Sequence, residues 1–471
     1  MSSDVIERSL AENRRRLVER LRWPENLGIG LRDLNVGGVP GTPALLVWID
    51  GLAGNEVLQE AILRPLTEYQ GSTAPELLAQ MMPVPDRTWE QQLDRVLGRI
   101  LEGWTALLVD GWDAALLLDT IDRPSRPAWQ SFHVYRESFS VDLRQNVTLL
   151  RKRVRDPRLR ALPVSLRRPD RGNVALVYLE GKALPSLVRL LRLWISCHMG
   201  EEMSQRGLQG GLPAIFGALP RFDSSGFPDD MATLVTMGYV LVLTDRSDRV
   251  LAAPVTVPFW LTSIGDIGSS YPVRRFLTVT RLLLHGLVLM LPGTIVALMN
   301  YHVDMVPTAF LTAIGAAREN APFGLIFEIL IAEFIIEVGR EISFRVPVGV
   351  HPGVGLVALA VTMLLLTHSG FLGPLASITS ILGALTALAL PNYAGTYIVR
   401  TCRYYMLLAA SILGFFGMAT FLAIFLAYLL RSRSWGIPVW GPSGLGFTAP
   451  EGRSNLPPRR SGGKRLWHTH G

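Results

Sequence analysis

Short apolar runs, each closed by an aspartate and a glycine, characterise the first 120 residues. Residues 45–49 end at Asp50-Gly51, and residues 106–109 end at Asp110-Gly111. Runs of this length followed by turn residues are typical of buried strands. A helical pattern follows the first run, and a third apolar run covers residues 114–118. Strands that alternate with helices predict an α/β fold for this part of the chain.

A second unit repeats this alternation. Residues 140–160 have helical periodicity, residues 174–179 and 240–243 predict strands, and residues 184–195 predict a helix. The segment 140–160 carries an arginine-rich face, for which a solvated helix surface is the simplest interpretation. We therefore expect two α/β subdomains, residues 1–132 and 133–270. No apolar stretch of signal-peptide length opens the sequence, so we expect this region to stay on the cytoplasmic side.

Long apolar runs with few charges distinguish residues 276–430. A membrane-spanning helix needs about 20 mainly apolar residues. The segments that qualify are 276–299, 348–367, 371–390 and 404–430, while a fifth, 323–339, is apolar but acidic. We expect an all-α transmembrane domain of four to five helices over residues 271–435. The polar tail that follows, residues 436–471, is expected to be largely disordered.

The positions of arginines favour a cytoplasmic amino-terminal region but leave two topologies open. Arg274 and Arg275 precede the first span, which keeps that side cytoplasmic. If residues 323–339 cross the bilayer, Arg400 and Arg403 lie inside and the basic tail lies outside. If they do not cross, Arg400 and Arg403 lie outside and the basic tail lies inside.

Composition narrows the classes of function. The 471 residues are 49% hydrophobic and 18% charged, against about 25% charged in ordinary soluble proteins. The net charge of +7 is almost all arginine, and beside an apolar half it favours membrane lipid over nucleic acid. Cys197 and Cys402 cannot form a disulfide framework. Phosphate-binding loops, nucleophile elbows and metalloprotease motifs are missing from the sequence, so we expect no enzyme, cofactor or metal.

The acidic apolar segment is the main candidate for a functional site. On a helical wheel, one face carries Glu333, Glu337, Arg340 and Glu341, and Glu328 lies apart from them. Ionisable groups at membrane depth usually mark an ion or substrate path or a buried pair, and a glutamate-rich lining favours cations. Two other interpretations stay open. The segment can lie along the bilayer surface, or Glu337 and Glu341 can pair with Arg340 and Arg345 and hold helices together.

Other membrane features have simpler interpretations. Arg281 lies near the start of the first span, and we expect its side chain to snorkel to the headgroups. Arg345 is expected to be a buried or interfacial charge. Gly373, Gly383 and Gly414 are expected to let helices pack closely.

Five blocks of sequence, in a fixed order, match the pattern of a known family. They are LLVWIDGLAGNEVLQEAILRPL (45–66), RESFSVDLRQNVTLLRKRVRDPRLR (136–160), LPGTIVALMNYHVDMVP (291–307), APFGLIFEILIAEFIIEVGREISFRVPVGVHPGVG (321–355) and WGIPVWGP (435–442). Together they resemble the A subunits of spore germinant receptors, the GerA family, over roughly residues 40–442. Ser138 replaces the glycine usual in the second block. The chain therefore resembles both a nutrient-receptor subunit and the related stage V sporulation protein AF.

The resemblance implies a location, partners and a function. Such subunits sit in the inner membrane of bacterial spores and act with a transporter-like B subunit and a lipoprotein C subunit. It also implies a homo-oligomer that forms a membrane channel, with the acidic helix as a channel element. We therefore expect a germinant receptor subunit that couples nutrient sensing to ion release as an oligomeric cation channel. The alternative is a membrane scaffold of the germination machinery without its own pore. A secondary transporter would have inverted repeats and more spans.

Overall fold

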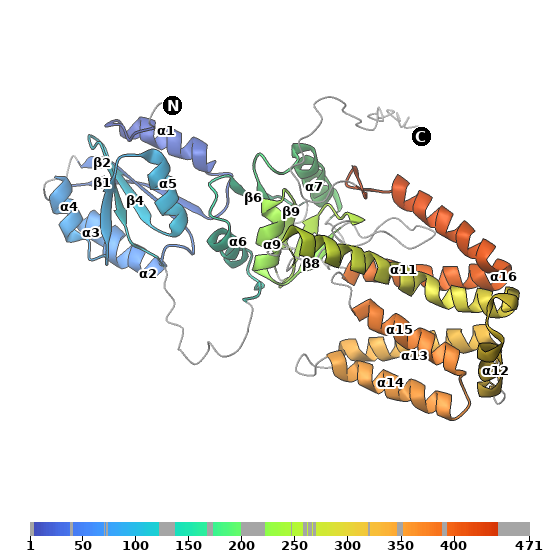
Figure 1. The fold of residues 1–471 in the computed structure, drawn as a ribbon. Coiled ribbons are helices and arrows are strands. Elements are labelled where there is room, and N and C mark those ends of the chain that lie inside the picture. The colour runs from blue at the N-terminus through green and yellow to red at the C-terminus, as the bar shows by residue number, and fades with distance from the viewer. Residues whose placement is uncertain are drawn as a thin grey trace, which may run out of the picture.

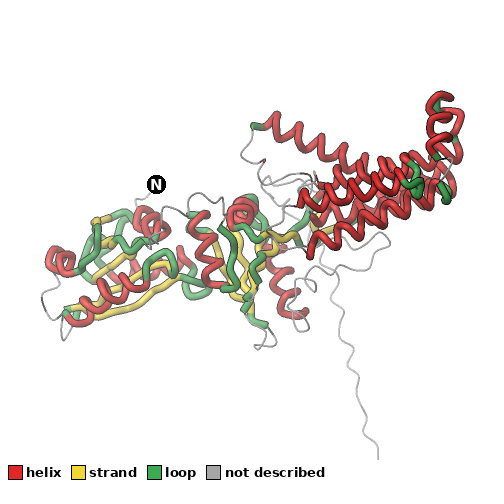
Figure 2. Tube along the Cα trace, turned by 90° about the horizontal axis from the view of Figure 1, so that it is seen from below, coloured by secondary structure: helices red, strands yellow, loops and turns green. Residues whose placement is uncertain are grey.

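A computed structural model places three regions in sequence order, from left to right in Figure 1. It describes residues 4–37, 41–69, 71, 74–121, 137–166, 173–198, 222–245, 247–257, 261, 266, 270–318, 321–345, 352–388 and 393–440. Most of the predicted polar tail, residues 441–471, lies outside these residues. Two sheets with flanking helices precede a helical region (Figure 2). The predicted order of two α/β subdomains followed by a helical region is confirmed.

The first subdomain is a five-stranded antiparallel sheet with strand order β1-β2-β4-β5-β3. Its strands are β1 (Ile29–Val36), β2 (Thr42–Ile49), β3 (Arg87–Glu90), β4 (Thr105–Val109) and β5 (Ala115–Leu118). Its helices are α1 (Leu10–Leu21), α2 (Asn55–Val57), the π-helical η1 (Leu58–Leu63), α3 (Arg64–Glu68), α4 (Pro75–Met81) and α5 (Leu93–Glu102). Both faces of the sheet are covered, because α1 and α5 pack on one face and η1, α3 and α4 on the other.

Burial on both faces explains why the strands read as uninterrupted apolar runs. Along β2, Leu45 and Val47 face α1 and α5, whereas Leu46 faces η1 and α4. Successive side chains of a strand point to opposite faces of the sheet, so every position of a covered strand is buried. The apolar run at residues 45–49 is therefore the direct signature of a two-sided core.

The second subdomain is another five-stranded antiparallel sheet, with strand order β6-β7-β9-β10-β8. Its strands are β6 (Leu159–Val164), β7 (Val174–Leu179), β8 (Asp223–Ser225), β9 (Val240–Thr244) and β10 (Val250–Ala253). Its helices are α6 (Leu143–Arg153), α7 (Pro185–His198) and α9 (Pro228–Thr236). Helices α6 and α9 cover one face and α7 covers the other.

The two subdomains are copies of one architecture. Each has a leading helix, a two-stranded hairpin, a helical connection, an edge strand, a second helix and a closing hairpin. Gly103 and Gly238 occupy equivalent positions, both with positive φ. A Cβ at Gly103 would lie 2.9 Å from the carbonyl oxygen of Leu52, and one at Gly238 would lie 2.8 Å from that of Lys182. Because only glycine fits such a close approach, the same constraint acts twice in the chain.

The leading helices are held in the same way in both copies. The Asp110 carboxylate, at the end of β4, accepts a hydrogen bond from the backbone N–H of Leu10 at 3.0 Å. The Asp245 carboxylate, at the end of β9, accepts one from Leu143 at 3.3 Å. These repeated contacts support a tandem duplication in the amino-terminal region.

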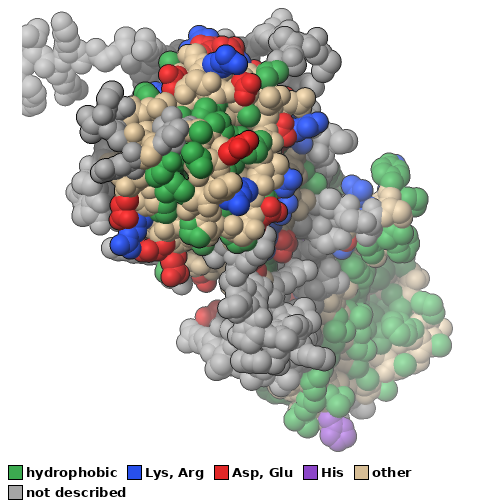
Figure 3. All heavy atoms as spheres, turned by 90° about the vertical axis from the view of Figure 1, so that its left-hand side faces the viewer, with side chains coloured by type: hydrophobic (Ala, Val, Ile, Leu, Met, Phe, Trp, Pro, Cys, Tyr) green, Lys and Arg blue, Asp and Glu red, His purple; other side chains and the backbone are tan. Residues whose placement is uncertain are grey.

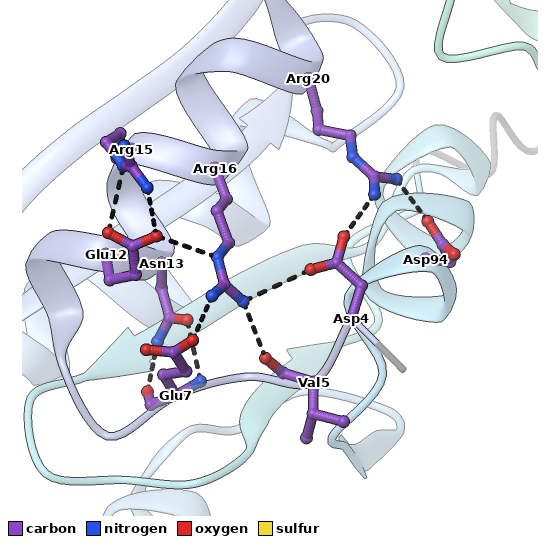
Figure 4. Close-up of polar contacts among 9 residues, drawn as sticks. All are labelled: Asp4, Val5, Glu7, Glu12, Asn13, Arg15, Arg16, Arg20 and Asp94. Carbon is purple, nitrogen blue, oxygen red and sulfur yellow. Dashed lines mark hydrogen bonds and ion pairs between the residues drawn. The ribbon is translucent and has the colours of Figure 1, made fainter. Parts of the chain in front are cut away.

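The amino-terminal arm is held by arginines of α1 (Figure 4). The Arg16 guanidinium contacts the carboxylates of Asp4 and Glu7 and donates to the Val5 carbonyl oxygen at 3.3 Å. Arg20 also contacts Asp4. The pairs are partly exposed, so each contributes little to stability, but together they fix the arm against α1.

A buried polar joint connects the two subdomains through Asn26. The Asn26 amide oxygen accepts hydrogen bonds from the Ala161 backbone N–H and from the Arg151 guanidinium, both at 2.9 Å. The same guanidinium donates to the Gly28 carbonyl oxygen at 2.9 Å. Burial lowers the pKa of Arg151 to about 10, and attraction by Asp50 opposes that shift. Arg151 is thus still protonated at neutral pH, so its charge depends on these acceptors.

The predicted solvated face of residues 140–160 is therefore wrong in part. Arg151 is buried in the joint, and Arg160 pairs with Glu180 at 2.5 Å. Arg153 contacts Glu137 at 2.8 Å and also Asp229. Three guanidinium groups of this face therefore bind acceptors within the amino-terminal region and do not only face solvent.

The helical region starts with a long helix and ends with a bent one. Its helices are α11 (Tyr271–Tyr301), the short η5 (Val303–Met305), α12 (Thr308–Ala317), α13 (Leu325–Arg345), α14 (Pro352–His368), α15 (Pro374–Leu388) and α16 (Tyr393–Arg431). A two-stranded hairpin, β11 (Arg433–Ser434) and β12 (Ile437–Pro438), follows. Among the described residues, α11 and residues 398–431 of α16 are long and apolar enough to cross a membrane.

Helix α16 folds back on itself, so the expectation of one continuous span over residues 404–430 is wrong. The backbone leaves helical geometry at Gly414, with φ 60° and ψ −138°. The rings of Tyr405 and Phe421 lie 6.5 Å apart, which brings the two arms side by side. The Tyr301 hydroxyl lies 2.7 and 2.8 Å from the carbonyl oxygens of Ser411 and Ile412, so its one proton is shared between acceptors that the bend exposes.

We predict that Asn26→Ala destabilises the joint between the subdomains. The substitution leaves the buried Ala161 N–H without its acceptor and removes one acceptor from Arg151. Such a loss lowers the free energy of unfolding by about 2–3 kcal/mol. Denaturant unfolding of the purified chain in detergent measures the change.

The matched control is Asn35→Ala, because Asn35 is exposed on β1. Its effect should stay within about 0.5 kcal/mol. Equal stability of the two variants would contradict a structural role for the joint.

Candidate functional site

The candidate site is a row of buried and partly buried charges between helices, which we call the charged seam. Its members are Glu328, Glu333 and Glu337 of α13, Arg318 at the end of α12, Arg400 and Arg403 of α16, and Gly373, Ser380 and Gly383 of the α15 segment. Apolar residues of α11, α13, α15 and α16 form a cluster beside it. The sequence placed the carboxylates on α13 but not the arginines that meet them.

The centre of the seam is an ion pair between Glu333 and Arg403. Both side chains are about 3% exposed, and the Arg403 guanidinium contacts the Glu333 carboxylate directly. The Ser380 hydroxyl, which is fully buried, donates to the same carboxylate at 2.9 Å. A buried charge requires such partners, because an unpaired one is very unfavourable in an apolar interior.

Arg403 reaches Glu333 because α15 has no side chain at position 383. A Cβ at Gly383 would lie 2.4 and 2.5 Å from the two terminal nitrogens of the Arg403 guanidinium. The expectation that Gly383 serves close packing of helices is thereby refined. The space that this glycine leaves is occupied by a charged side chain from α16.

Glu328 is paired at the end of the seam nearest α12. Its carboxylate accepts hydrogen bonds from the Arg318 guanidinium at 2.8 Å and from the Gly373 backbone N–H at 2.9 Å. The Glu328 side chain is fully buried. A Cβ at Gly373 would lie 2.6 Å from this carboxylate, so a second glycine also makes room for a charge.

Glu337 continues the seam. Its carboxylate lies 2.7 Å from the Arg400 guanidinium, and it is 35% exposed. Glu341 is exposed one turn further along α13. The side chains of Arg340 and Arg345 lie outside the described residues. The helical wheel therefore grouped side chains that differ in exposure, since Glu333 is buried and Glu341 is exposed. It separated Glu328 from them, although Glu328 is the most buried acidic side chain described on α13.

This geometry decides between some of the interpretations of α13. A helix lying along a bilayer surface in contact with solvent would expose its carboxylates, whereas Glu328 and Glu333 are buried in protein. The glutamates Glu328, Glu333 and Glu337 contact arginines of α12 and α16. The expected pairing with Arg340 and Arg345 falls on side chains outside the described residues. The seam thus joins segments that lie far apart in the sequence.

Arg281 is largely buried against acceptors of the protein. Its guanidinium contacts the Asp266 carboxylate and donates to the Leu261 carbonyl oxygen at 3.2 Å, and its side chain is 14% exposed. The acceptors come from the segment that precedes α11, where no periodic pattern predicts them. Arg281 therefore ties the first helix of the helical region to the segment leading from the second subdomain.

We predict that Gly383→Ala breaks the central pair of the seam. The new methyl group would displace the flexible guanidinium of Arg403 and separate it from Glu333, leaving two buried charges without each other. Breaking a buried pair lowers the free energy of unfolding by about 3 kcal/mol. Unfolding in mixed micelles measures the change.

Gly286→Ala is the matched control, because a Cβ at this position of α11 would have no atom within 4 Å. It should be neutral or slightly stabilising. If both variants unfold at the same denaturant concentration, Gly383 has no role in admitting Arg403.

Comparison with known proteins gives consistent matches. The family model described as Bacillus/Clostridium GerA spore germination protein matches residues 18–443. Spore germination protein KA of Bacillus subtilis (strain 168) is 24% identical over 425 residues, covering 88% of this chain and 78% of that protein. Spore germination protein GerLA of Bacillus cereus is 23% identical over 459 residues, covering 94% and 92%.

A further relative is also named a spore germination protein, and one match is a solved structure. Spore germination protein A1 of Bacillus subtilis (strain 168) is 26% identical over 358 residues, covering 74% of each chain. The crystal structure of the N-terminal domain of the A subunit of the Bacillus megaterium spore germinant receptor GerK3 is 16% identical, with a TM-score of 0.41. That match covers 54% of this chain and 98% of the domain. Because the family model spans most of its length, the protein belongs to the Bacillus/Clostridium GerA spore germination protein family.

Proposed function

We propose that this protein is a membrane subunit of a spore germinant receptor and couples nutrient sensing to ion release. Its relatives are named spore germination proteins, and the family model spans most of the chain. The proposed partners are a transporter-like B subunit, a lipoprotein C subunit and further copies of this chain. The proposed location is the inner membrane of the spore.

The surface supports a membrane location for the helical region. Figure 3 shows charged side chains of both signs over the amino-terminal region, whereas the visible part of the helical region is covered by hydrophobic ones. The apolar side chains exposed there include Phe276, Leu283, Phe334, Leu364 and Phe416. A soluble protein rarely exposes so large a contiguous apolar surface.

The bend at Gly414 supports a third membrane topology, different from the two considered from the sequence. In the proposed arrangement α11, α13, α14, α15 and the two arms of α16 each cross the bilayer. Six crossings bring residue 440 back to the side of the amino-terminal region, and they place Arg400 on that side as well. Both arginine-rich segments then obey the positive-inside rule, which neither topology with a single α16 span allowed.

The observation that carries the proposed mechanism is the charged seam. In the conformation described here, Glu333 and Glu337 are neutralised by Arg403 and Arg400. We infer that this is the closed state, since carboxylates held by guanidinium groups offer nothing to a passing cation. A signal from the partner subunits that separates α13 from α16 would free these carboxylates to line a path. For this to gate, the signal must bind the open state more tightly than the closed one.

The test is ion efflux from the assembled receptor with Glu333→Gln or Glu337→Gln. Each substitution removes a charge and weakens the pair that closes the seam. We expect efflux without germinant to rise and cation selectivity with germinant to fall, each by about tenfold for 1.4 kcal/mol of lost pairing. Subunit assembly, measured by co-purification, should be unchanged.

Asp304→Asn is the control, because Asp304 is an exposed carboxylate of the same region. It should leave efflux unchanged. Normal efflux from both glutamate variants would remove the pore role and favour the alternative, a scaffold in which the seam only holds helices together.

A further inference from the structure

The end of the chain returns to the second subdomain as a short strap, which we define as residues 432–439. Its strands pair Arg433 with Pro438 and Ser434 with Ile437 around a tight turn. The turn needs positive φ at both Trp435 and Gly436, at 54° and 83°. A non-glycine residue rarely takes this conformation, so the strap is built to present the Trp435 side chain at a defined place.

Trp435 packs against two aromatic rings of the second subdomain, which also contact each other. Its ring centroid lies 5.3 Å from that of Trp194 on α7 and 5.1 Å from that of Phe222. The interplanar angles are 82° and 57°, and such inclined pairs are favourable aromatic contacts. Phe222 is 1% exposed, so the strap contributes to the core beneath α7 and not merely to its surface.

The strap also bonds to the segment that leaves the sheet toward α11. The Val257 backbone N–H donates to the Val439 carbonyl oxygen at 2.8 Å, and the Val255 N–H donates to the Ser434 hydroxyl at 3.2 Å. Val439 is 2% exposed. The second subdomain therefore holds the last helix of the helical region at the same place from which its first helix departs.

An unbroken apolar core leads from the strap to the charged seam. One buried cluster contains Val257 and Val439, then Leu429 and Met418 on the second arm of α16, and Cys402 on the first arm. Cys402 directly precedes Arg403, the arginine at the centre of the seam. Because close-packed cores shift as units and do not deform smoothly, a displacement of the strap has to move the arm that carries Arg403.

We propose that the strap transmits the state of the second subdomain to the charged seam, a refinement that rests on the proposed receptor function. With Trp435 packed against Trp194 and Phe222, α16 is held where Arg403 meets Glu333. When α7 moves, the strap shifts and the pair separates. The regulatory element is thus the Trp435 contact, at a distance from the charges that it controls.

The chain supplies its own reporter, because it has only two cysteines and they differ in exposure. Cys402 is buried on the arm that carries Arg403, and Cys197 is exposed on α7. In a Cys197→Ser background, the rate of labelling of Cys402 by N-ethylmaleimide in membranes reports how often this arm opens. The measurement does not involve ion flux, so it stands even if the channel role fails.

We expect Trp435→Ala to raise the labelling rate of Cys402 by about five- to tenfold, the shift expected for the loss of one or two aromatic pairs. Trp194→Ala should have the same effect, and the double variant should add little to either single one. Trp435→Phe should keep labelling slow, because a ring still fills the site. Trp440→Ala, a substitution of an exposed tryptophan just beyond the strap, should leave the rate unchanged.

Unchanged labelling in both Trp435→Ala and Trp194→Ala would overturn the proposal. It would also be overturned if the two effects were fully additive, because the tryptophans would then act separately. If Trp435→Ala does not accumulate in membranes, the other two variants provide the test. Fast labelling of Cys402 in Trp194→Ala with slow labelling in Trp435→Phe supports the proposal, and equal rates in both contradict it.

Discussion

A charge can remain inside an apolar helical bundle only where the protein supplies its partner, and this constraint organises the helical region. Glu328, Glu333 and Glu337 would be unfavourable on a helix that packs among leucines and phenylalanines. Each instead meets an arginine, from the end of α12 or from the first arm of α16. The arginines set the relative positions of helices far apart in sequence. Gly383 of α15 and Gly373, which precedes α15, leave the space that the charged side chains need.

The amino-terminal region is attached to this arrangement at two points. Arg281 ties α11 to the connector from the second subdomain, and the strap ties the end of α16 to its core. The first subdomain, a copy of the second, joins through the buried contacts of Asn26 and Arg151. A change in either subdomain thus has a path of protein contacts toward the seam.

The sequence predicted much of the fold and part of the site, for identifiable reasons. Buried strands such as β2 and β4 were found because both their faces are covered, which makes them uniformly apolar. Strands β1 and β6 were missed because charged and polar residues interrupt them, and α12 was missed because it is short. The duplication had a signal in the similar runs LVWIDG (46–51) and LVYLEG (176–181). The boundaries of the subdomains at residues 132 and 270 stay predictions.

The sequence alone could locate the glutamates of the charged seam but not the arginines that pair with them. Periodicity places Glu333 and Glu337 on neighbouring positions of one helix, but it contains no information about which helix packs opposite. Arg400 and Arg403 read as flanking charges that set topology, because the bend at Gly414 is not visible in an apolar run. Similarly, Gly383 reads as a packing residue, since a missing side chain does not reveal what fills its place.

The most direct test of this account is a double-mutant cycle on Glu333 and Arg403. The free energies of unfolding of Glu333→Gln, Arg403→Met and the double variant are compared with that of the unmodified chain in mixed micelles. The account predicts a coupling energy of about 2 kcal/mol or more, with the double variant more stable than at least one single variant. Additive effects of the two substitutions would contradict it, because the two charges would then not depend on each other.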